Sequence, residues 1–213
     1  MDEARDLLVT GLKGLNLTLS EHQIEQLLNF IKLIEKWNKA YNLTAIRSRQ
    51  DMIRLHLFDS LAVLSFIQGQ RVIDIGTGAG LPGIPLAIAL PNTEFTLLDS
   101  NAKKTRFVQQ VVLELKLKNV TICHQRVEKF HPEYLFNEII TRAFTNLSEM
   151  VELTSHLLCK EGVLLAMKGK MLESELTQLS SQYSADVIPI QVPGIDAERC
   201  LIRIKFLARA EVP

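Results

Sequence analysis

The sequence predicts an α/β fold: a doubly wound sheet, mostly parallel with an antiparallel edge, that follows a helical extension. Three observations support this prediction. From Arg71 onward, short β-rich segments alternate with helical segments of about 10–15 residues, which is typical of parallel sheets with helical crossovers. A glycine-rich loop follows the first of these strands. Before residue 68 the apolar residues recur at helical spacing, so we expect a helical segment, 1–67, packed on a sheet domain, 68–213.

The first part of the chain carries two signals for the start of a helix. Ser20 followed by Gln23 has the spacing of a capping box, and Ser48 can cap a further helix. No linker rich in Gly, Pro or Ser follows, so we expect these helices to pack against the sheet. The side chains expected in the core are Ile24, Leu27, Leu28, Ile31, Ile34 and Trp37, followed by Ile53, Leu55, Leu57, Leu61, Val63 and Leu64.

The alternating part of the chain predicts five strands with helices between them, and then a final pair of strands. The last two strands are expected to pair antiparallel at the sheet edge. Early prolines in the helix after the first strand suit its first turn. The predicted strands are 71–75, 94–99, 119–123, 137–142, 162–169, 185–192 and 200–208, and the predicted helices are 81–90, 101–117, 147–158 and 172–182.

Composition excludes several classes of protein. The chain has 213 residues, of which 47% are hydrophobic, enough for one sizeable core. No apolar run is long enough to span a bilayer, and the first residues, MDEARDLL, do not resemble a signal peptide. We therefore expect a cytoplasmic protein with no membrane partner. The net charge is zero, which argues against a general nucleic-acid coat but allows a local basic face.

The three cysteines do not predict a metal site. Cys123, Cys159 and Cys200 lie far apart, form no CxxC pair and have no histidine cluster beside them. We expect them to be reduced, buried thiols in a cytosolic protein, and we expect no metal.

Two motifs overlap in the glycine-rich loop. Gly78, Gly80 and Gly83 form GxGxxG, the dinucleotide pattern, whereas Asp74, Gly76, Gly78 and Gly80 form DxGxGxG, a pattern of S-adenosylmethionine (AdoMet) sites. A dinucleotide would place a pyrophosphate on this turn, where the carboxylate of Asp74 would repel it. AdoMet instead carries a sulfonium and an ammonium group, and a nearby acid favours both. Asp74 therefore favours AdoMet.

Three further positions complete a predicted nucleoside pocket. Asp99 ends the second strand and suits hydrogen bonds to ribose hydroxyls, although it can also cap the next helix. Val127 and Glu128 follow the third strand, where an adenine edge can meet backbone groups. Arg142 ends the fourth strand and can clamp a cofactor carboxylate with paired hydrogen bonds; the alternative is an ordinary surface salt bridge.

Missing motifs narrow the reaction. The chain has no Asn/Asp-Pro-Pro-Tyr after the fourth strand, as amine methylation of adenine commonly uses, and no Pro-Cys for a covalent route to a pyrimidine carbon. A ring nitrogen with a free lone pair, such as guanine N7, attacks a methyl group without first losing a proton. We therefore assign no catalytic side chain and expect the rate gain to come from orientation.

An RNA substrate would give a role to basic residues that we expect near one rim of the sheet. Such residues contact phosphates in a salt-sensitive and sequence-blind way. His56 has an alternative role as a structural histidine. The predicted RNA-binding residues are Arg47, Arg54, His56, Lys103, Lys104, Arg106, Arg126 and Lys168, with Arg49 and Lys170 close by in the sequence.

A set of motifs, in order along nearly the whole chain, resembles the bacterial RsmG family, also called the glucose-inhibited division protein B family. The motifs are KWNKAYNLTAIR (36–47), RLHLFDSL (54–61), VIDIGTGAGLPGIPLAI (72–88), TLLDSNAKKTRFV (96–108), QRVEKF (125–130), TRAF (141–144), LAMKGK (165–170) and QVPGIDAERCLIRIK (191–205).

The resemblance implies the class I AdoMet-dependent methyltransferase fold, with a Rossmann-like sheet. It implies a cytoplasmic enzyme that methylates N7 of one guanine, position 527, in 16S ribosomal RNA of the small subunit. Family positions that bind AdoMet match Gly76, Leu81, Val127, Glu128 and Arg142 here. The family loop often has proline where this chain has Ala79, and a small residue there should not disturb the turn.

Two other functions are weighed against RNA methylation. GxGxxG with Asp99 also suits a nicotinamide-dependent oxidoreductase, although Asp74 and the lack of a catalytic proton donor near the loop count against it. A non-catalytic RNA- or ribosome-binding module would retain the same fold. We expect a monomer whose partner is RNA and not DNA.

Overall fold

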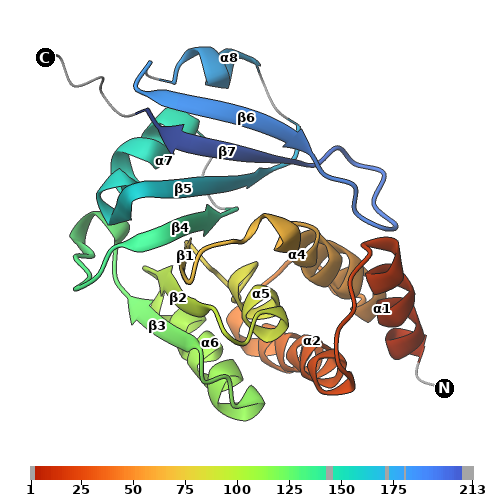
Figure 1. Ribbon diagram of the computed structural model, residues 1–213. Coiled ribbons are helices and arrows are strands. Elements are labelled where there is room, and N and C mark those ends of the chain that lie inside the picture. Colours follow the sequence, from red (N-terminus) through yellow and green to blue (C-terminus); the bar gives the residue numbers. More distant parts are fainter. Residues whose placement is uncertain (1–2, 143–145, 171–172, 180, 208–213) are drawn as a thin grey trace, which may run out of the picture.

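The computed structural model of the protein describes residues 3–142, 146–170, 173–179 and 181–207. Within them, a seven-stranded sheet has the order β3-β2-β1-β4-β5-β7-β6 (Figure 1). Strands β1 to β5 run parallel, and β7 pairs antiparallel with both β5 and β6. The strands are β1 Arg71–Ile75, β2 Glu94–Asp99, β3 Val120–His124, β4 Phe136–Thr141, β5 Leu158–Lys168, β6 Tyr183–Pro189 and β7 Cys200–Phe206.

Helices cover both faces of this sheet. The N-terminal helices lie on the same face as α5 and α6, whereas α7 lies on the opposite face (Figure 1). The helices are α1 Glu3–Gly14, α2 Glu21–Tyr41, α3 Arg49–Met52, η1 Ile53–Phe58, α4 Asp59–Leu61, η2 Leu64–Phe66, α5 Gly83–Ala89, α6 Ala102–Leu115, η3 Val127–Lys129, α7 Leu147–Thr154, η4 Ser155–Leu157 and α8 Glu173–Thr177. Among the described residues no helix is long and apolar enough to cross a membrane.

Two apolar cores lie on the two faces of the sheet. Successive residues of a strand point to opposite faces, so Val72 belongs to one core and Ile73 to the other. The core that contains Val72 also contains Leu27 of α2, Ile53 of η1 and Phe107 of α6. Residues before and after position 67 therefore share one continuous core, which fixes the helical segment against the sheet.

Both predicted helix starts are confirmed. Ser20 accepts a hydrogen bond from the Gln23 backbone while the Gln23 side chain binds the Ser20 backbone, which is a complete capping box. Ser48 accepts from the backbone N–H of Asp51 at the start of α3. The three elements that follow form one nearly continuous helical stretch, and its middle, Ile53–Phe58, is a π-helix.

The parallel sheet and its antiparallel edge are confirmed, with differences at some element ends. Strand β5 begins at Leu158 and not at residue 162, because Leu158 already pairs with Phe136 of β4. The helix predicted over 147–158 is correspondingly shorter, since α7 ends at Thr154. The helix predicted over 172–182 is described as α8 only over Glu173–Thr177, and residues 172 and 180 of that prediction lie outside the described part.

Candidate active site

The glycine loop lies at the carboxyl edge of the sheet, between β1 and α5. Its strand, β1, has β2 on one side and β4 on the other, so the strand order reverses there. Ligands of doubly wound sheets bind at this switch point. Gly76, Gly78 and Gly80 have φ angles of +70°, +60° and +85°, a region that side chains disfavour. The sequence therefore uses glycine where the backbone needs that freedom.

Asp74 lies beneath this loop and is fully buried. Its Oδ2 accepts hydrogen bonds from the Thr77 hydroxyl at 2.6 Å and from the Gly83 backbone N–H at 2.8 Å. Its Oδ1 has no hydrogen-bond partner among the described residues. Burial raises the pKa of Asp74 to about 6, against the opposing effect of those two hydrogen bonds. A buried carboxylate oxygen without a partner suits a cationic ligand group, as the sequence predicts.

Asp99 connects β2 to the same loop. Its Oδ2 accepts from the Gly78 backbone N–H and its Oδ1 from the Asn101 backbone N–H, both at 2.8 Å. The cap of α6 is Asn101, whose side chain accepts from the N–H groups of Lys103 and Lys104. Asp99 is therefore not the helix cap. Each of its oxygens retains a lone pair that can accept a hydrogen bond from a ribose hydroxyl.

A pocket of about 200 Å³ brings together four of the eight predicted cofactor residues, Gly76, Asp99, Val127 and Glu128; Asp74, Gly78 and Arg142 do not line it. It joins the ends of β1, β2 and β3, and Leu153 of α7 closes one side. Leu81 does not line this pocket and is only 4% exposed. The pocket is lined by Ile75, Gly76, Leu98, Asp99, Ser100, Gln125, Arg126, Val127, Glu128 and Leu153.

Arg142 lies on the other side of the switch point, directly after β4. Its Nη1 lies 3.2 Å from Oδ2 of Asp59, whose Oδ1 accepts a hydrogen bond from Nε of Arg199 at 2.8 Å. Asp59 is 8% exposed, so this is a largely buried carboxylate shared by two arginines. The three residues come from α4, the end of β4 and the segment before β7, and the ion pairs therefore join three distant parts of the chain.

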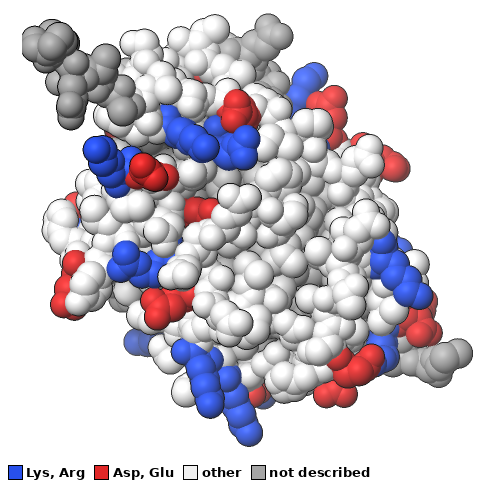
Figure 2. Space-filling model, in the orientation of Figure 1, with Lys and Arg blue, Asp and Glu red and all other residues white. Residues whose placement is uncertain are grey.

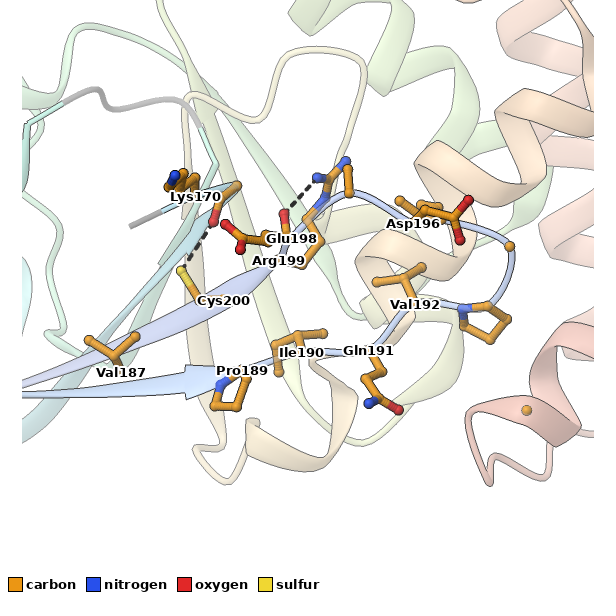
Figure 3. A pocket seen from close by; sticks show the side chains of 16 residues that line it. Lys170, Val187, Pro189, Ile190, Gln191, Val192, Asp196, Glu198, Arg199 and Cys200 are labelled. Carbon is orange, nitrogen blue, oxygen red and sulfur yellow. Dashed lines mark hydrogen bonds between the residues drawn. The ribbon is translucent and has the colours of Figure 1, made fainter. Parts of the chain in front are cut away.

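The arginine pair lines a cavity of about 160 Å³ that also contains Lys168. Gly169, Ile190, Arg199 and Cys200 line this cavity and also a larger open cleft of about 960 Å³. Figure 3 shows the cleft, with the 187–200 segment along one wall and Lys170 near the end of β5. The cleft is large enough for a nucleotide, and the smaller cavity continues it toward Arg142. Of the TRAF motif, Ala143 and Phe144 lie outside the described residues.

A family model described as rRNA small subunit methyltransferase G (GidB) matches residues 23–202. The chain belongs to this family. A relative in Idiomarina loihiensis, named ribosomal RNA small subunit methyltransferase G, is 50% identical over 198 residues, which cover 91% of this chain and 96% of the relative. A relative of the same name in Escherichia coli O17:K52:H18 is 45% identical, over 93% of this chain and 96% of its own.

Solved structures show the fold of this family member to be that of class I AdoMet-dependent methyltransferases. The crystal structure of M. jannaschii TYW2 in complex with AdoMet aligns with a TM-score of 0.56 at 17% identity, over 71% of this chain and 75% of that chain. The N-methyltransferase NodS of Bradyrhizobium japonicum, in complex with S-adenosylhomocysteine, aligns with a TM-score of 0.56 at 14% identity, over 81% and 98%. At such identities the likeness concerns the fold alone.

The residues predicted from the sequence to bind RNA do not form one continuous rim at the edge of the sheet. Arg126 lines the cofactor pocket, and Nζ of Lys104 lies 3.9 Å from the position that a Cβ on Gly78 would take. Arg54 lies beside Gly194 at the cleft, where a Cβ on Gly194 would come within 3.1 Å of Nε of Arg54, and its Nη1 lies 3.7 Å from Oδ1 of Asp51. On the face in Figure 2, basic and acidic side chains are interspersed around the margin. Lys103 and Arg106 extend from α6, Lys168 is paired with Glu175, and Arg47 lines a separate groove.

His56 requires a correction, because it is only 5% exposed and does not lie on a phosphate-binding surface. Its Nε2 lies 3.0 Å from the Thr44 hydroxyl. Burial, together with the charge of Arg142, lowers the pKa of His56 to about 4. A neutral, buried imidazole does not provide a cation for RNA, so the structural alternative describes this residue better. Sequence position beside Arg54 suggested a basic patch, but the π-helix η1 directs His56 inward.

The low pKa of His56 predicts a loss of stability in acid. Its pKa of about 4 in the folded chain lies below the ordinary value of 6.5. The unfolded chain therefore binds more protons between these values, so stability is present above pH 6.5 and is lost as pH falls toward 4. We expect the wild type to lose about 2 kcal/mol more than His56→Gln between pH 7 and pH 5. Urea unfolding at the two pH values measures this, and equal losses in both proteins would contradict it.

Gly78 provides a test of how closely a ligand approaches the loop. A Cβ at this position would make only ordinary van der Waals contacts, with the Gly76 carbonyl oxygen at 3.8 Å and with Nζ of Lys104 at 3.9 Å. We expect Gly78→Ala to cost about 1–2 kcal/mol of stability, because of its positive φ, yet to weaken AdoMet binding at least about tenfold. Calorimetric titration and thermal melting measure the two effects.

Gly83 is the matched control for Gly78. A Cβ there would lie 2.2 Å from Cδ2 of Leu97 and 2.7 Å from Oδ2 of Asp74. Gly83→Ala should therefore lose stability by overpacking, about 1–3 kcal/mol or more, before any ligand is added. Unchanged AdoMet affinity in Gly78→Ala would place the cofactor away from this part of the loop.

The three cysteines are free thiols. Burial raises the pKa values of Cys123 and Cys200, which makes their thiolates scarce at neutral pH. Among the described residues, no group of three or more His, Cys, Asp or Glu side chains is arranged to hold a metal ion.

Sequence reasoning missed three residues of the site. Thr77 is 1% exposed and holds Asp74 through its hydroxyl. Asp59 and Arg199 form the ion pairs with Arg142 described above. The role of Thr77 could have been predicted from the sequence, because a hydroxyl three residues after an acid in a tight turn can donate a hydrogen bond back to that acid. No local pattern indicated the role of Asp59, since its inward position depends on the π-helix before it and on the packing of distant segments.

Proposed function

We propose that this protein transfers the methyl group of AdoMet to N7 of a guanine, position 527, in 16S ribosomal RNA of the bacterial small subunit. Family membership supports methylation of small-subunit ribosomal RNA with AdoMet as the donor. The N7 atom and the position rest on the sequence resemblance. The observation that carries the proposal is the buried Oδ1 of Asp74, which has no hydrogen-bond partner among the described residues and lies beneath the glycine loop.

The predicted cofactor residues suit the parts of AdoMet. Asp74 would stabilise the positive charge near the loop, and Asp99 would accept hydrogen bonds from the ribose. Val127 and Glu128 would flank the adenine, beside the 200 Å³ pocket that they line. Arg142 would bind the carboxylate of the methionine moiety, which agrees with its position on the other side of β1.

The reaction needs orientation more than proton transfer. When bound, AdoMet would supply a methyl group on a sulfonium; the N7 lone pair would attack the methyl carbon, so that a C–N bond forms while the C–S bond breaks and its electron pair stays on the sulfur of S-adenosylhomocysteine. No proton is removed, and this agrees with a site to which we assign no general base. The protein would hold the base in line with the methyl group, and such alignment supplies a large part of the rate gain. Arg199 lies across Asp59 from Arg142.

Incubation of the protein with methyl-labelled AdoMet and either 30S subunits or naked 16S RNA tests the proposal. We expect label in the RNA under at least one condition. No label under either condition would favour a non-catalytic RNA-binding module. Calorimetric titration with S-adenosylhomocysteine and with NADH addresses the oxidoreductase alternative, because binding of NADH alone would contradict an AdoMet site. A monomeric cytoplasmic protein that acts on RNA and not on DNA fits the proposed function.

A further inference from the structure

A second concave surface lies on the helical segment, apart from the cofactor pocket and the cleft. It is a groove of about 470 Å³ between the C-terminal half of α2 and the segment that leads into α3. We call it the α2 groove. Its lining residues are Lys32, Glu35, Lys36, Asn38, Lys39, Arg47, Arg49 and Met52.

The α2 groove carries an excess of positive charge. Five of its lining residues are cationic and one, Glu35, is acidic. Glu35 is already engaged by Arg49, with N–O distances of 2.7–3.1 Å. Lys36, Lys39 and Arg47 are exposed, and none of them forms an ion pair within the described ranges of the chain. The groove therefore presents positive charges that no acidic side chain in the described part of the chain pairs with.

The spacing of the lysines suits a polyanion more than a single small anion. Lys32, Lys36 and Lys39 follow one another at intervals of four and three residues, which places them on one face of α2. At 1.5 Å per residue the row extends over roughly 10 Å, and a nucleic-acid backbone presents several phosphates over such a length. Arg47 approaches from a different segment, so the cations converge on a hollow and do not simply cover a convex helix face.

A chain of buried polar contacts connects the α2 groove to the arginine pair of the candidate active site. Asn38, which lines the groove, exchanges two hydrogen bonds of 3.0 Å with the backbone of Thr44. The Thr44 hydroxyl lies 3.0 Å from Nε2 of His56. His56 is close enough to Arg142 and Asp59 for both charges to affect its pKa. These contacts run from the groove toward the arginine pair.

We propose that the α2 groove binds the sugar–phosphate backbone of the RNA substrate, at a part of the strand other than the target guanine. The groove itself indicates only a polyanion, and the identification of that polyanion as RNA rests on the proposed function. Binding there would hold the RNA in register with the cofactor pocket without reading its sequence. It also gives the helical segment a role beyond covering the sheet.

The test compares two double variants with equal change of charge. Lys36→Gln/Lys39→Gln removes two cations from the groove, and Lys118→Gln/Lys160→Gln removes two exposed cations near the amino ends of β3 and β5, at the opposite edge of the sheet. We measure affinity for naked 16S RNA as a function of salt concentration. The groove variant should bind RNA about tenfold more weakly. The negative slope of log affinity against log salt concentration should become less steep by about 1.4, since each phosphate contact to a single strand contributes roughly 0.7.

Kinetics and a cofactor control complete the test. The groove variant should raise KM for RNA with little change in kcat at saturating RNA, and its affinity for S-adenosylhomocysteine should be unchanged. An unaltered salt slope in the groove variant, or an equal fall in the control variant, would overturn the proposal. If the wild type shows the groove-dependent salt slope but places no methyl group in RNA, the proposed function fails and the groove stands. If the wild type methylates RNA while the salt slope is unaltered in the groove variant, the proposed function stands and the groove proposal fails.

Discussion

Asp74→Asn is expected to weaken AdoMet binding by about 30-fold while RNA affinity changes by less than about twofold, since an interaction with a charged group contributes about 2 kcal/mol. The substitution keeps the shape of the side chain and an oxygen that can accept from Thr77 and Gly83. It removes the negative charge that the cofactor cation would face. S-adenosylhomocysteine lacks the sulfonium, so its affinity should fall less than that of AdoMet. Calorimetric titration of both ligands measures the difference.

The same variant should be more stable than the wild type in the absence of ligand. The pKa of Asp74, about 6 in the folded chain, lies above its ordinary value of 3.8. The folded chain therefore binds more protons between these values, and stability falls as pH rises through this window. Asn at this position removes that fall, a gain of up to about 3 kcal/mol near pH 7. Equal loss of cofactor and RNA binding in a folded Asp74→Asn protein would contradict the assigned role.

Asp59→Asn is expected to lower kcat/KM for methyl transfer by about 100-fold, because Arg142 and Arg199 would lose the carboxylate that positions both. The two guanidinium groups are each about a quarter exposed, at 27% and 26%, so solvent should limit the loss of stability to about 1–2 kcal/mol. Methylation kinetics and chemical unfolding, measured on the same preparations, separate the two effects.

Asp51→Asn is the matched control for Asp59→Asn. Asp51 lies 3.7 Å from Arg54 and its side chain is 54% exposed, so its removal should change neither activity nor stability by much. Asp59→Glu, which keeps the charge on a longer side chain, should recover part of the lost activity. A folded Asp59→Asn protein with wild-type kcat/KM would show that the shared carboxylate serves the fold alone.

The part of the structure that sequence predicted best is the part governed by local pattern. Strands β1 and β2 occupy the predicted residues 71–75 and 94–99, because each is a short apolar run between polar turns. The capping box at Ser20 was predicted for the same reason, since its partners are three residues apart. Asp74 and Asp99 were correctly placed at strand ends beside the loop, because parallel strands bring their carboxyl ends to one edge.

The parts that sequence did not predict depend on contacts between distant segments. The start of β5 at Leu158 follows from its pairing with Phe136, which no local pattern indicates. The inward positions of His56 and Asp59 follow from a π-helix and from Arg142 and Arg199, which lie more than eighty residues further along the chain. Arg54 and His56 are close in the sequence, which suggested that they share one surface, but His56 is buried.

The most direct test of the central claim is a mass map of 16S RNA after reaction with the protein and AdoMet. The RNA is digested with a base-specific nuclease, and each fragment is compared with its counterpart from a reaction without AdoMet. We predict one added methyl group on a single fragment, on a guanine at position 527, with the chain cleavage after borohydride reduction and aniline treatment that marks N7-methylguanine. A methyl group on another base, at another atom of guanine or at another position, or the absence of any methylated fragment, would contradict the account.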